Sequence, residues 1–428
     1  LETVDLANLS TDAIQALTTS ALAGLSAANQ VAKLTTTQIG ALSSAQISSL
    51  STAQVTALVT AQTNKLSSDQ ISALTTAQLV AMTTAGVAAL TTNAISSITT
   101  AQAAKLTTAQ IVALTTAQAA ALSTDTLSAL SSAQVAAFET ADLAQVTTAA
   151  MAAISTAALA GLSTAQISKL GTSQVSGLTS DQVAVLSTAN VNALTTTQVS
   201  NLTSVQLAAL TSAQAKAIGT AQMAALGTAQ INKLNTDQMG ALTASQIKAI
   251  TTDGLVALGS DQIAAISSAG ITGLTTDQVV ALTTTQMDKL TTGQMAALTS
   301  AQVGALETRD LNKLTSDQVG AITTASLRGL TTTQVAALGT AQLSSLTTGQ
   351  LVSMTTASVA ALTTAQTVAL TTDQVAALTS AQAKAMVTDD IAALTSVQVA
   401  SISTASVAAL TTDQVVALTT TQMDKLTT

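Results

Sequence analysis

Apolar residues recur along this chain with a fixed period of eight. Counted from the first threonine of the consensus Thr-Thr-x-Gln-Val-Ala-Ala-Leu, positions five and eight are apolar, whereas positions one, two and four are mostly polar. Three octads (residues 2–25) are followed by a nine-residue variant (26–34) and forty-nine uninterrupted octads (35–426). A short period of this kind predicts a repeat architecture whose units bury their apolar faces against one another.

The charged residues indicate that each octad is a helix. Nineteen of the 21 acidic residues lie in the first half of an octad, and 12 of the 13 basic residues lie at its sixth or seventh position, with Arg309 as the exception. A helix carries partial positive charge at its start and partial negative charge at its end. The sorting of charges within every octad therefore favours a helix over a β-strand, which has little net dipole.

The first and fourth positions indicate where each helix begins. The first position is mostly Thr or Ser, which are preferred as helix N-caps, and Gln three residues later completes a capping box. In an octad such as 331–338, we predict that the first residue is the N-cap. The other seven residues would form a helix roughly 10 Å long.

Two other backbone arrangements fit the pattern less well. In one continuous helix, the apolar stripe would rotate by about 80° per octad, and no straight partner could follow it. A β-solenoid is the runner-up, because Thr and Val suit strands, although strict apolar alternation is missing. The predicted fold is an all-α solenoid of very short helices. The number of octads per turn is not readable from the sequence, and two per turn would give a length of roughly 250 Å.

Positions five and eight are the predicted core. Position eight is apolar in all 53 units, and position five is apolar except at Thr63 and Thr367. Methionines at position five are predicted to pack in the core rather than to bind a cofactor; they include Met223, Met239, Met287 and Met295. Two such side chains cannot offset the entropy of ordering eight residues, so a lone octad is expected to be unfolded.

The second position is Thr or Ser throughout residues 35–426, apart from Ala244. We predict that its hydroxyl is buried between octads and bonds a backbone carbonyl of a neighbouring octad. The alternative is that recent duplication of repeats has left this position undiverged. Residues 275–292 and 411–428 are identical and lie 17 octads apart, which shows that larger blocks were duplicated.

No linker or change in composition interrupts the pattern, so residues 1–428 are predicted to form one continuous domain. The chain begins on an eighth-position leucine and ends on the Thr-Thr of an unfinished octad, so we expect it to be a segment of a longer array. The apolar runs are far shorter than the ~20 residues that a membrane-spanning helix needs. A net charge of −8, with only two arginines and one aromatic residue, argues against nucleic acid as a partner.

Composition also restricts the chemistry. The chain has no His and no Cys, which excludes disulfides and the usual zinc, haem and thiolate sites, and deprives a serine hydrolase of its base. The closest pairs of carboxylates for glycoside hydrolysis are Asp389 with Asp390, and Asp253 with Asp261. First-turn acids at helix starts explain both pairs better. Calcium at adjacent third-position aspartates is a weaker alternative, and no catalytic, metal or cofactor site is predicted.

Octads such as residues 330–338, Leu-Thr-Thr-Thr-Gln-Val-Ala-Ala-Leu, resemble the octapeptide-rich regions of very large bacterial exoproteins described as adhesion-related or haem-utilisation proteins. The resemblance covers the whole chain. It implies a secreted protein, attached to the cell surface or part of a matrix. The haem label does not carry over, because the chain has no His, Cys or Tyr ligand.

These observations favour a structural protein without catalytic activity: an extracellular or bacterial cell-surface rod, fibre or filament, serving as an adhesin stalk, surface filament or biofilm-matrix element. Self-association into fibres or head-to-tail filaments is expected, with a cell-surface or matrix polysaccharide as a further partner. The alternative is a binding module that presents ladders of Thr and Gln to a polysaccharide or an ice surface. Regular hydroxyl rows favour this alternative, whereas the lack of aromatic stacking residues weakens it.

Overall fold

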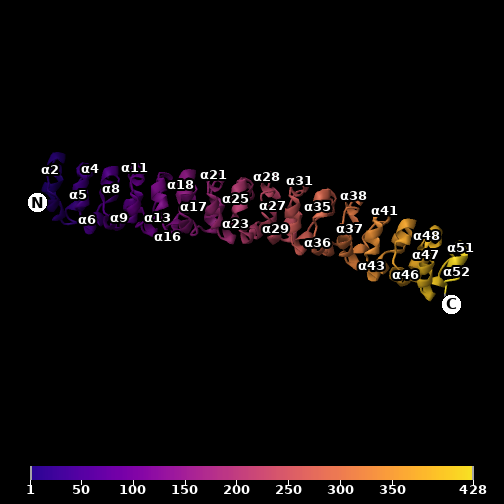
Figure 1. Ribbon diagram of the computed structural model, residues 1–428. Helices are drawn as coiled ribbons and strands as arrows, with labels where there is room; N and C mark the ends of the chain where they lie inside the picture. The colour runs from indigo at the N-terminus through magenta and orange to yellow at the C-terminus, as the bar shows by residue number, and fades with distance from the viewer. Residues whose placement is uncertain (1, 427–428) are drawn as a thin grey trace. The chain divides into compact units, whose positions relative to one another are not determined.

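The predicted all-α solenoid is confirmed. The computed structural model describes residues 2–426, and within them it contains 52 α-helices, one 3-10 helix and no β-strand. The chain divides into two compact units, Leu1–Ala217 and Ile218–Thr428. In each unit, short helices follow one another in chain order along the array (Figure 1). The unfinished octad noted at the end of the sequence, residues 427–428, lies outside the described residues.

The α-helices are four to six residues long and each occupies one octad. The helices of the first unit are α1 Thr3–Ala7, α2 Thr11–Gln15, α3 Thr19–Ala23, η1 Val31–Lys33, α4 Thr36–Ala41, α5 Ser44–Ser48, α6 Thr52–Thr56, α7 Thr60–Thr63, α8 Ser68–Ala73, α9 Thr76–Ala81, α10 Thr84–Ala88, α11 Thr92–Ser96, α12 Thr100–Ala103, α13 Thr108–Val112, α14 Thr116–Ala120, α15 Thr124–Ser128, α16 Ser132–Ala137, α17 Thr140–Leu143, α18 Thr148–Ala153, α19 Thr156–Leu159, α20 Thr164–Lys169, α21 Thr172–Ser176, α22 Ser180–Ala184, α23 Thr188–Ala193, α24 Thr196–Ser200, α25 Ser204–Ala209 and α26 Ser212–Ala217.

The helices of the second unit are α27 Thr220–Ala225, α28 Thr228–Ile231, α29 Thr236–Ala241, α30 Ala244–Ala249, α31 Thr252–Val256, α32 Ser260–Ala265, α33 Ser268–Ile271, α34 Thr276–Ala281, α35 Thr284–Asp288, α36 Thr292–Ala297, α37 Ser300–Gly304, α38 Thr308–Leu311, α39 Ser316–Gly320, α40 Thr324–Leu327, α41 Thr332–Ala337, α42 Thr340–Ser344, α43 Thr348–Ser353, α44 Thr356–Ala360, α45 Thr364–Val368, α46 Thr372–Ala377, α47 Ser380–Ala385, α48 Thr388–Ala393, α49 Ser396–Ser401, α50 Thr404–Val407, α51 Thr412–Ala417 and α52 Thr420–Met423.

Each α-helix begins at the second position of its octad, as the capping pattern predicts. In α9, the Thr75 side chain accepts from the Gln78 backbone N–H, and the Gln78 side chain accepts from the Thr75 N–H. The prediction of seven helical residues was too long. Met82, at the eighth position, has φ −60° and ψ 137°, because the chain must leave the helix there to enter the next octad.

Three octads make one turn of the solenoid. Within each unit, a helix packs against the helices three places before and after it, as α15 packs on α18 and α46 on α49. Helices in the same place in successive turns therefore form a stack. A turn of two octads, on which the length of roughly 250 Å depended, is wrong. A turn of only two octads would leave little room between its helices for an apolar interior.

The predicted core is confirmed. Residues at positions five and eight fill the interior, with exceptions near the chain ends such as Met423, which is exposed. The position-five methionines predicted for the core are buried there, namely Met223, Met239, Met287 and Met295. Thr63 and Thr367, the two polar residues at position five, are buried as well. The single aromatic residue, Phe138, is only 4% exposed, which shows that the interior accepts one large ring at position eight.

The prediction for the second position was wrong in its main point. No second-position residue whose exposure is described within residues 2–426 is buried. Three serines nevertheless donate to a backbone carbonyl in the next turn, as Ser380 Oγ does to Ala405 O at 2.9 Å. The side chain at this position, in the first turn of each helix, faces outward. The buried polar contact between turns of the solenoid is therefore made by another residue.

Candidate functional site

The buried polar contact is made by the fourth residue of the octad. This residue is the third residue of the helix proper, so its side chain lies where one octad meets the turn before it. In the octad 99–106, Gln102 Oε1 accepts from the Thr99 N–H at 2.8 Å, and Thr99 Oγ1 accepts from the Gln102 N–H at 3.3 Å. The capping box thus uses the glutamine oxygen and leaves its amide Nε2 free to donate elsewhere.

That amide donates to the preceding turn. Gln102 Nε2 lies 2.8 Å from Ile71 O and 2.7 Å from Leu74 O, which are 31 and 28 residues earlier in the chain. Gln366 repeats both contacts, at 2.8 Å to Val335 O and 2.7 Å to Leu338 O. We call this repeated set of contacts the glutamine ladder. Gln102 and Gln366 are both almost fully buried, so losing the amide of either would leave buried carbonyls unsatisfied, at a cost of about 1–3 kcal/mol.

Other side chains with a donor keep part of the ladder. Asn190 Nδ2 donates to Leu162 O at 2.9 Å, and Ser326 Oγ donates to Leu298 O at 2.6 Å. Thr126 and Ser406 make the same contact with the carbonyl 28 residues earlier. The fourth position therefore favours a hydrogen-bond donor directed at that carbonyl, whatever the length of the side chain.

Alanine, glycine and aspartate interrupt the ladder. Alanine and glycine have no donor, and the octads of one turn, residues 139–162, have Asp142, Ala150 and Ala158 at the fourth position. Aspartate at this position is buried at Asp142, Asp310 and Asp390. An ionised carboxylate only accepts hydrogen bonds, so it cannot donate to a carbonyl as the glutamine amide does.

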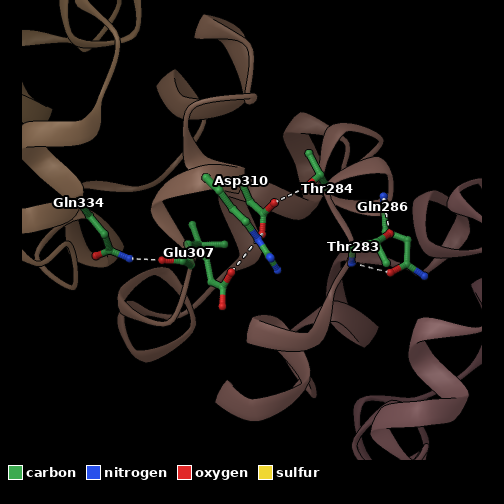
Figure 2. A network of polar contacts seen from close by, with 8 residues as sticks. Thr283, Thr284, Gln286, Glu307, Asp310 and Gln334 are labelled. Atoms are coloured by element: carbon green, nitrogen blue, oxygen red, sulfur yellow. Dashed lines mark hydrogen bonds and ion pairs between the residues drawn. The ribbon is translucent and has the colours of Figure 1, made fainter.

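The surroundings of Asp310 are shown in Figure 2. Its Oδ1 accepts from Thr284 Oγ1 at 2.6 Å, and the same contact joins Thr116 to Asp142 at 2.7 Å. Arg309 Nε lies 2.7 Å from Glu307 Oε2 and 3.5 Å from Asp310 Oδ2. A nearby guanidinium therefore balances the Asp310 carboxylate, although Oδ2 itself has no hydrogen-bond partner.

Asp390 has different surroundings. Its Oδ2 and the Oγ1 atom of Thr367 are buried without hydrogen-bond partners. Burial raises the pKa of the Asp390 carboxyl above its ordinary value of 3.8, and the charge of Asp389 raises it further. The hydroxyls of Thr364 and Thr367 act in the opposite direction on this pKa. The neighbour that precedes Asp390 is thus an acid, whereas the one that precedes Asp310 is a base.

The two carboxylate pairs considered from the sequence do not form catalytic dyads. Asp389 is exposed and Asp390 is buried, although both lie in the first turn of α48. Asp253 and Asp261 are both exposed and lie in the first turns of α31 and α32, which belong to different stacks because α31 packs on α34 and α32 on α35. Within residues 2–426, no three acidic side chains gather closely enough to hold a metal ion.

The ladder was not predicted, although the sequence contains a signal for it. Octads that begin with Gly171, Gly219 or Gly339 have no side chain to complete a reciprocal capping box, yet each retains Gln at position four. In these octads the glutamine oxygen still accepts from the glycine N–H, as at Gly171. A glutamine that persists when its capping partner is missing indicates a second role.

Comparison with known proteins identifies the repeat. A family model described as ALTTAQ repeat matches the chain thirteen times, at residues 1–36, 31–68, 71–108, 135–172, 151–188, 215–252, 233–268, 255–292, 287–324, 311–348, 346–380, 383–420 and 391–428. A search of curated proteins finds no similar sequence. Among the described residues, no helix is both long enough and apolar enough to cross a membrane.

Proposed function

We propose a structural role for this chain, which belongs to the ALTTAQ repeat family. The chain acts as an extracellular or bacterial cell-surface rod: an adhesin stalk, a surface filament or a biofilm-matrix element. The observation that carries the proposal is the glutamine ladder, which ties successive turns within each unit by the same buried bonds, as at Gln102 and Gln366. The proposed role includes no catalysis, no cofactor and no nucleic acid.

The dimensions of the repeat suit a stalk. With three octads per turn, 53 units give about 18 turns, and helices pack roughly 9–10 Å apart, so a straight array would be roughly 160–180 Å long. Every turn presents the same kind of stacking surface to the next turn. We therefore propose that copies of the chain associate head to tail into longer filaments, anchored to a cell-surface or matrix polysaccharide.

Electron microscopy of the purified chain, with small-angle scattering, tests the shape. The expected particle is a thin rod whose length increases when whole turns of three octads are added. A globule whose diameter grows slowly with chain length would contradict the proposal. Labelling of intact producing cells with an antibody against the array tests localisation: surface labelling without permeabilisation is expected, and labelling only after permeabilisation would contradict it.

A binding module is the second candidate, in a revised form. The part of that alternative that relied on glutamine is wrong, because the glutamines at position four are buried in the ladder, apart from the half-buried Gln230 and Gln262. The second-position hydroxyls are exposed or half-buried, and within each unit they repeat at the same place in every helix of a stack. Rows of hydroxyls on a regular frame favour a polysaccharide or an ice surface. Ice shaping or glycan-array binding that is lost on Thr→Val substitution along one stack would support this candidate, and no signal in either assay would remove it.

A further inference from the structure

Asp390 occupies a position that otherwise calls for a donor. It is the fourth residue of the octad 387–394, and the carbonyl that a donor there would reach belongs to Leu362. At the same spacing, Asn190 donates to Leu162 O and Ser406 donates to Leu378 O at 2.8 Å. Asparagine has the same shape as aspartate, so the Asn190 contact shows which bond a side chain of this size can make.

The backbone places that carbonyl next to the fourth position even where no side chain reaches for it. A Cβ atom added to Gly270 would lie 3.2 Å from Leu242 O, the carbonyl that corresponds to Leu362 O. A Cβ atom added to Gly86 would lie 3.4 Å from Cγ2 of Thr63, which precedes Gly86 by the same interval as Thr367 precedes Asp390. The Leu362 carbonyl and the Thr367 side chain are therefore the neighbours expected for the Asp390 carboxyl.

The hydrogen bonding around Asp390 is incomplete when the carboxyl is ionised. No side chain among the described residues donates to Leu362 O. Asp390 Oδ2 is buried and has no partner, and Asp390 is 1% exposed. A carboxylate beside a carbonyl places two acceptors together, which is unfavourable in a buried site. One proton on the carboxyl would supply the missing donor.

The charges around Asp390 favour that proton. Its helix α48 packs against α45, which has no titratable residue, and against α51, which carries Asp413. Its own helix adds Asp389. The nearest base in the sequence, Lys384, belongs to α47, which packs on α44 and α50. At Asp310, by contrast, Arg309 offers a positive charge 3.5 Å from Oδ2.

We propose that Asp390 is held as the neutral carboxylic acid in the folded array and donates a hydrogen bond to the backbone carbonyl of Leu362, so that its turn is more stable in acid than at neutral pH. The carboxyl O–H takes the place of the glutamine amide. The array thus contains an acid-stabilised link at α48.

The direction of the pH dependence follows from the raised pKa of Asp390. Below the pKa of the unfolded chain, near 3.8, the carboxyl is protonated in both states and the link is at full strength. As the pH rises from there through the folded-state pKa, the unfolded chain releases its proton while the folded chain must keep it or lose the bond. The stability of this turn therefore falls over that interval and levels off above the folded-state pKa.

Carbon-13 NMR of the full chain labelled at aspartate carboxyls tests the protonation directly. The D390N variant identifies the Asp390 resonance as the one that disappears from the spectrum. We expect the pKa of that resonance to lie above the ordinary aspartate value. A resonance that titrates at or below pH 4 would overturn the proposal.

Native-state hydrogen exchange of the peptide 387–394 tests the link itself. D390N supplies a permanent donor, as Asn190 does, so its protection should exceed that of the unsubstituted chain at pH 7 and match it near pH 4. The comparison variant is D310N, which supplies the same donor but also removes the ion pair between Arg309 and Asp310. It should therefore raise protection in 307–314 at pH 7 by less than D390N raises it in 387–394. Equal protection of D390N and the unsubstituted chain at both pH values would overturn the proposal.

Discussion

The first unit contains two consecutive turns, residues 139–162 and 163–186, whose apolar interiors are equally buried. They differ in the hydrogen bonds that their fourth-position residues make. The fifth positions of the earlier turn are Leu143, Met151 and Leu159, and all three are fully buried. The later turn has Ile167, Val175 and Val183 at the corresponding places, with at most 2% exposure. By apolar burial alone, the two turns are equivalent.

The fourth positions separate the two turns. Gln166, Gln174 and Gln182 of the later turn each donate to the carbonyl 28 residues earlier in the chain, for example Gln174 Nε2 to Val146 O at 2.6 Å. The earlier turn has Asp142, Ala150 and Ala158, and among the described residues no side chain donates to the carbonyls of Leu114, Leu122 and Leu130. The turn 139–162 is thus stacked by apolar packing and by the hydrogen bond from Thr116 to Asp142, and it is missing the ladder.

The earlier turn also contains a close backbone contact. A Cβ atom added to Gly161 would lie 2.2 Å from Ser132 O, a distance that only glycine tolerates. Small residues at positions four and seven of the octad 155–162 bring it close to the octad 131–138. The difference between the two turns teaches that apolar residues build every turn, whereas the fourth residue decides how firmly one turn is bonded to the last. We expect the array to open first at 139–162.

The largest effect should come from removing the ladder of the later turn. The triple variant Gln166→Ala, Gln174→Ala, Gln182→Ala leaves buried carbonyls without donors, which should cost about 1–3 kcal/mol per glutamine, or roughly 3–9 kcal/mol in all. Hydrogen exchange of peptides from 163–186 measures the loss. Ser173→Ala, an exposed change in the same turn, is the control. A triple variant with undiminished protection would show that the ladder contributes nothing.

Truncation of the shared apolar interior should affect both turns alike. Met151→Ala and Ile167→Ala each remove a fully buried side chain at position five, so each should destabilise its turn by about 2–5 kcal/mol. Urea unfolding followed by circular dichroism, with local hydrogen exchange, compares the two variants. A much smaller cost at Met151 would mean that the earlier turn is loosely packed as well as without the glutamine ladder, and the two turns would then differ in their interiors too.

Restoring one rung should strengthen the weaker turn. Ala150→Gln places an amide at the fourth position of the octad 147–154, and it should add about 1 kcal/mol of local stability. The matched control is Ala149→Gln, one residue earlier on the exposed third position. Increased protection of residues 147–154 is expected for the first variant alone. The same increase in both would trace the effect to helix propensity instead.

The smallest effect is expected at the second position. Thr156→Val in the earlier turn and Thr164→Val in the later turn change exposed hydroxyls to methyl groups of the same shape, so stability should change by less than about 0.5 kcal/mol in each. Thermal unfolding of the two variants measures this. A clear loss in either turn would restore a structural role for the hydroxyl that its exposure argues against.

Much of the fold could be predicted from local patterns. Threonine caps, first-turn acids and the fifth and eighth positions each act within one octad or at its edges, so the sequence shows them directly. Met223 and Met295 were assigned to the core on spacing alone, and they are buried there. Helix length was overestimated because nothing within one octad shows that the eighth residue must turn the chain.

The relations between turns were harder to predict. The carbonyls that Gln102 contacts belong to Ile71 and Leu74 in the preceding turn, and their identity depends on the number of octads per turn, which no single octad encodes. For the same reason, the sequence led us to predict that the second-position hydroxyl is buried between octads. The fourth-position side chain is buried there instead. From the sequence, a buried aspartate at position 390 could not be distinguished from an exposed one, because an acid suits the first turn of a helix in either case.

A count of three octads per turn has a consequence for how such a protein can change. Each octad touches those three places away, so gaining or losing one octad leaves every later contact intact and only rotates the later octads by a third of a circle. The duplicated blocks beginning at residues 275 and 411 lie 17 octads apart, which is not a multiple of three, so the same residues point toward different flanks. Growth by copying therefore scatters surface chemistry around the axis, and selection can adjust the length of this protein far more easily than it can keep one flank distinct from another.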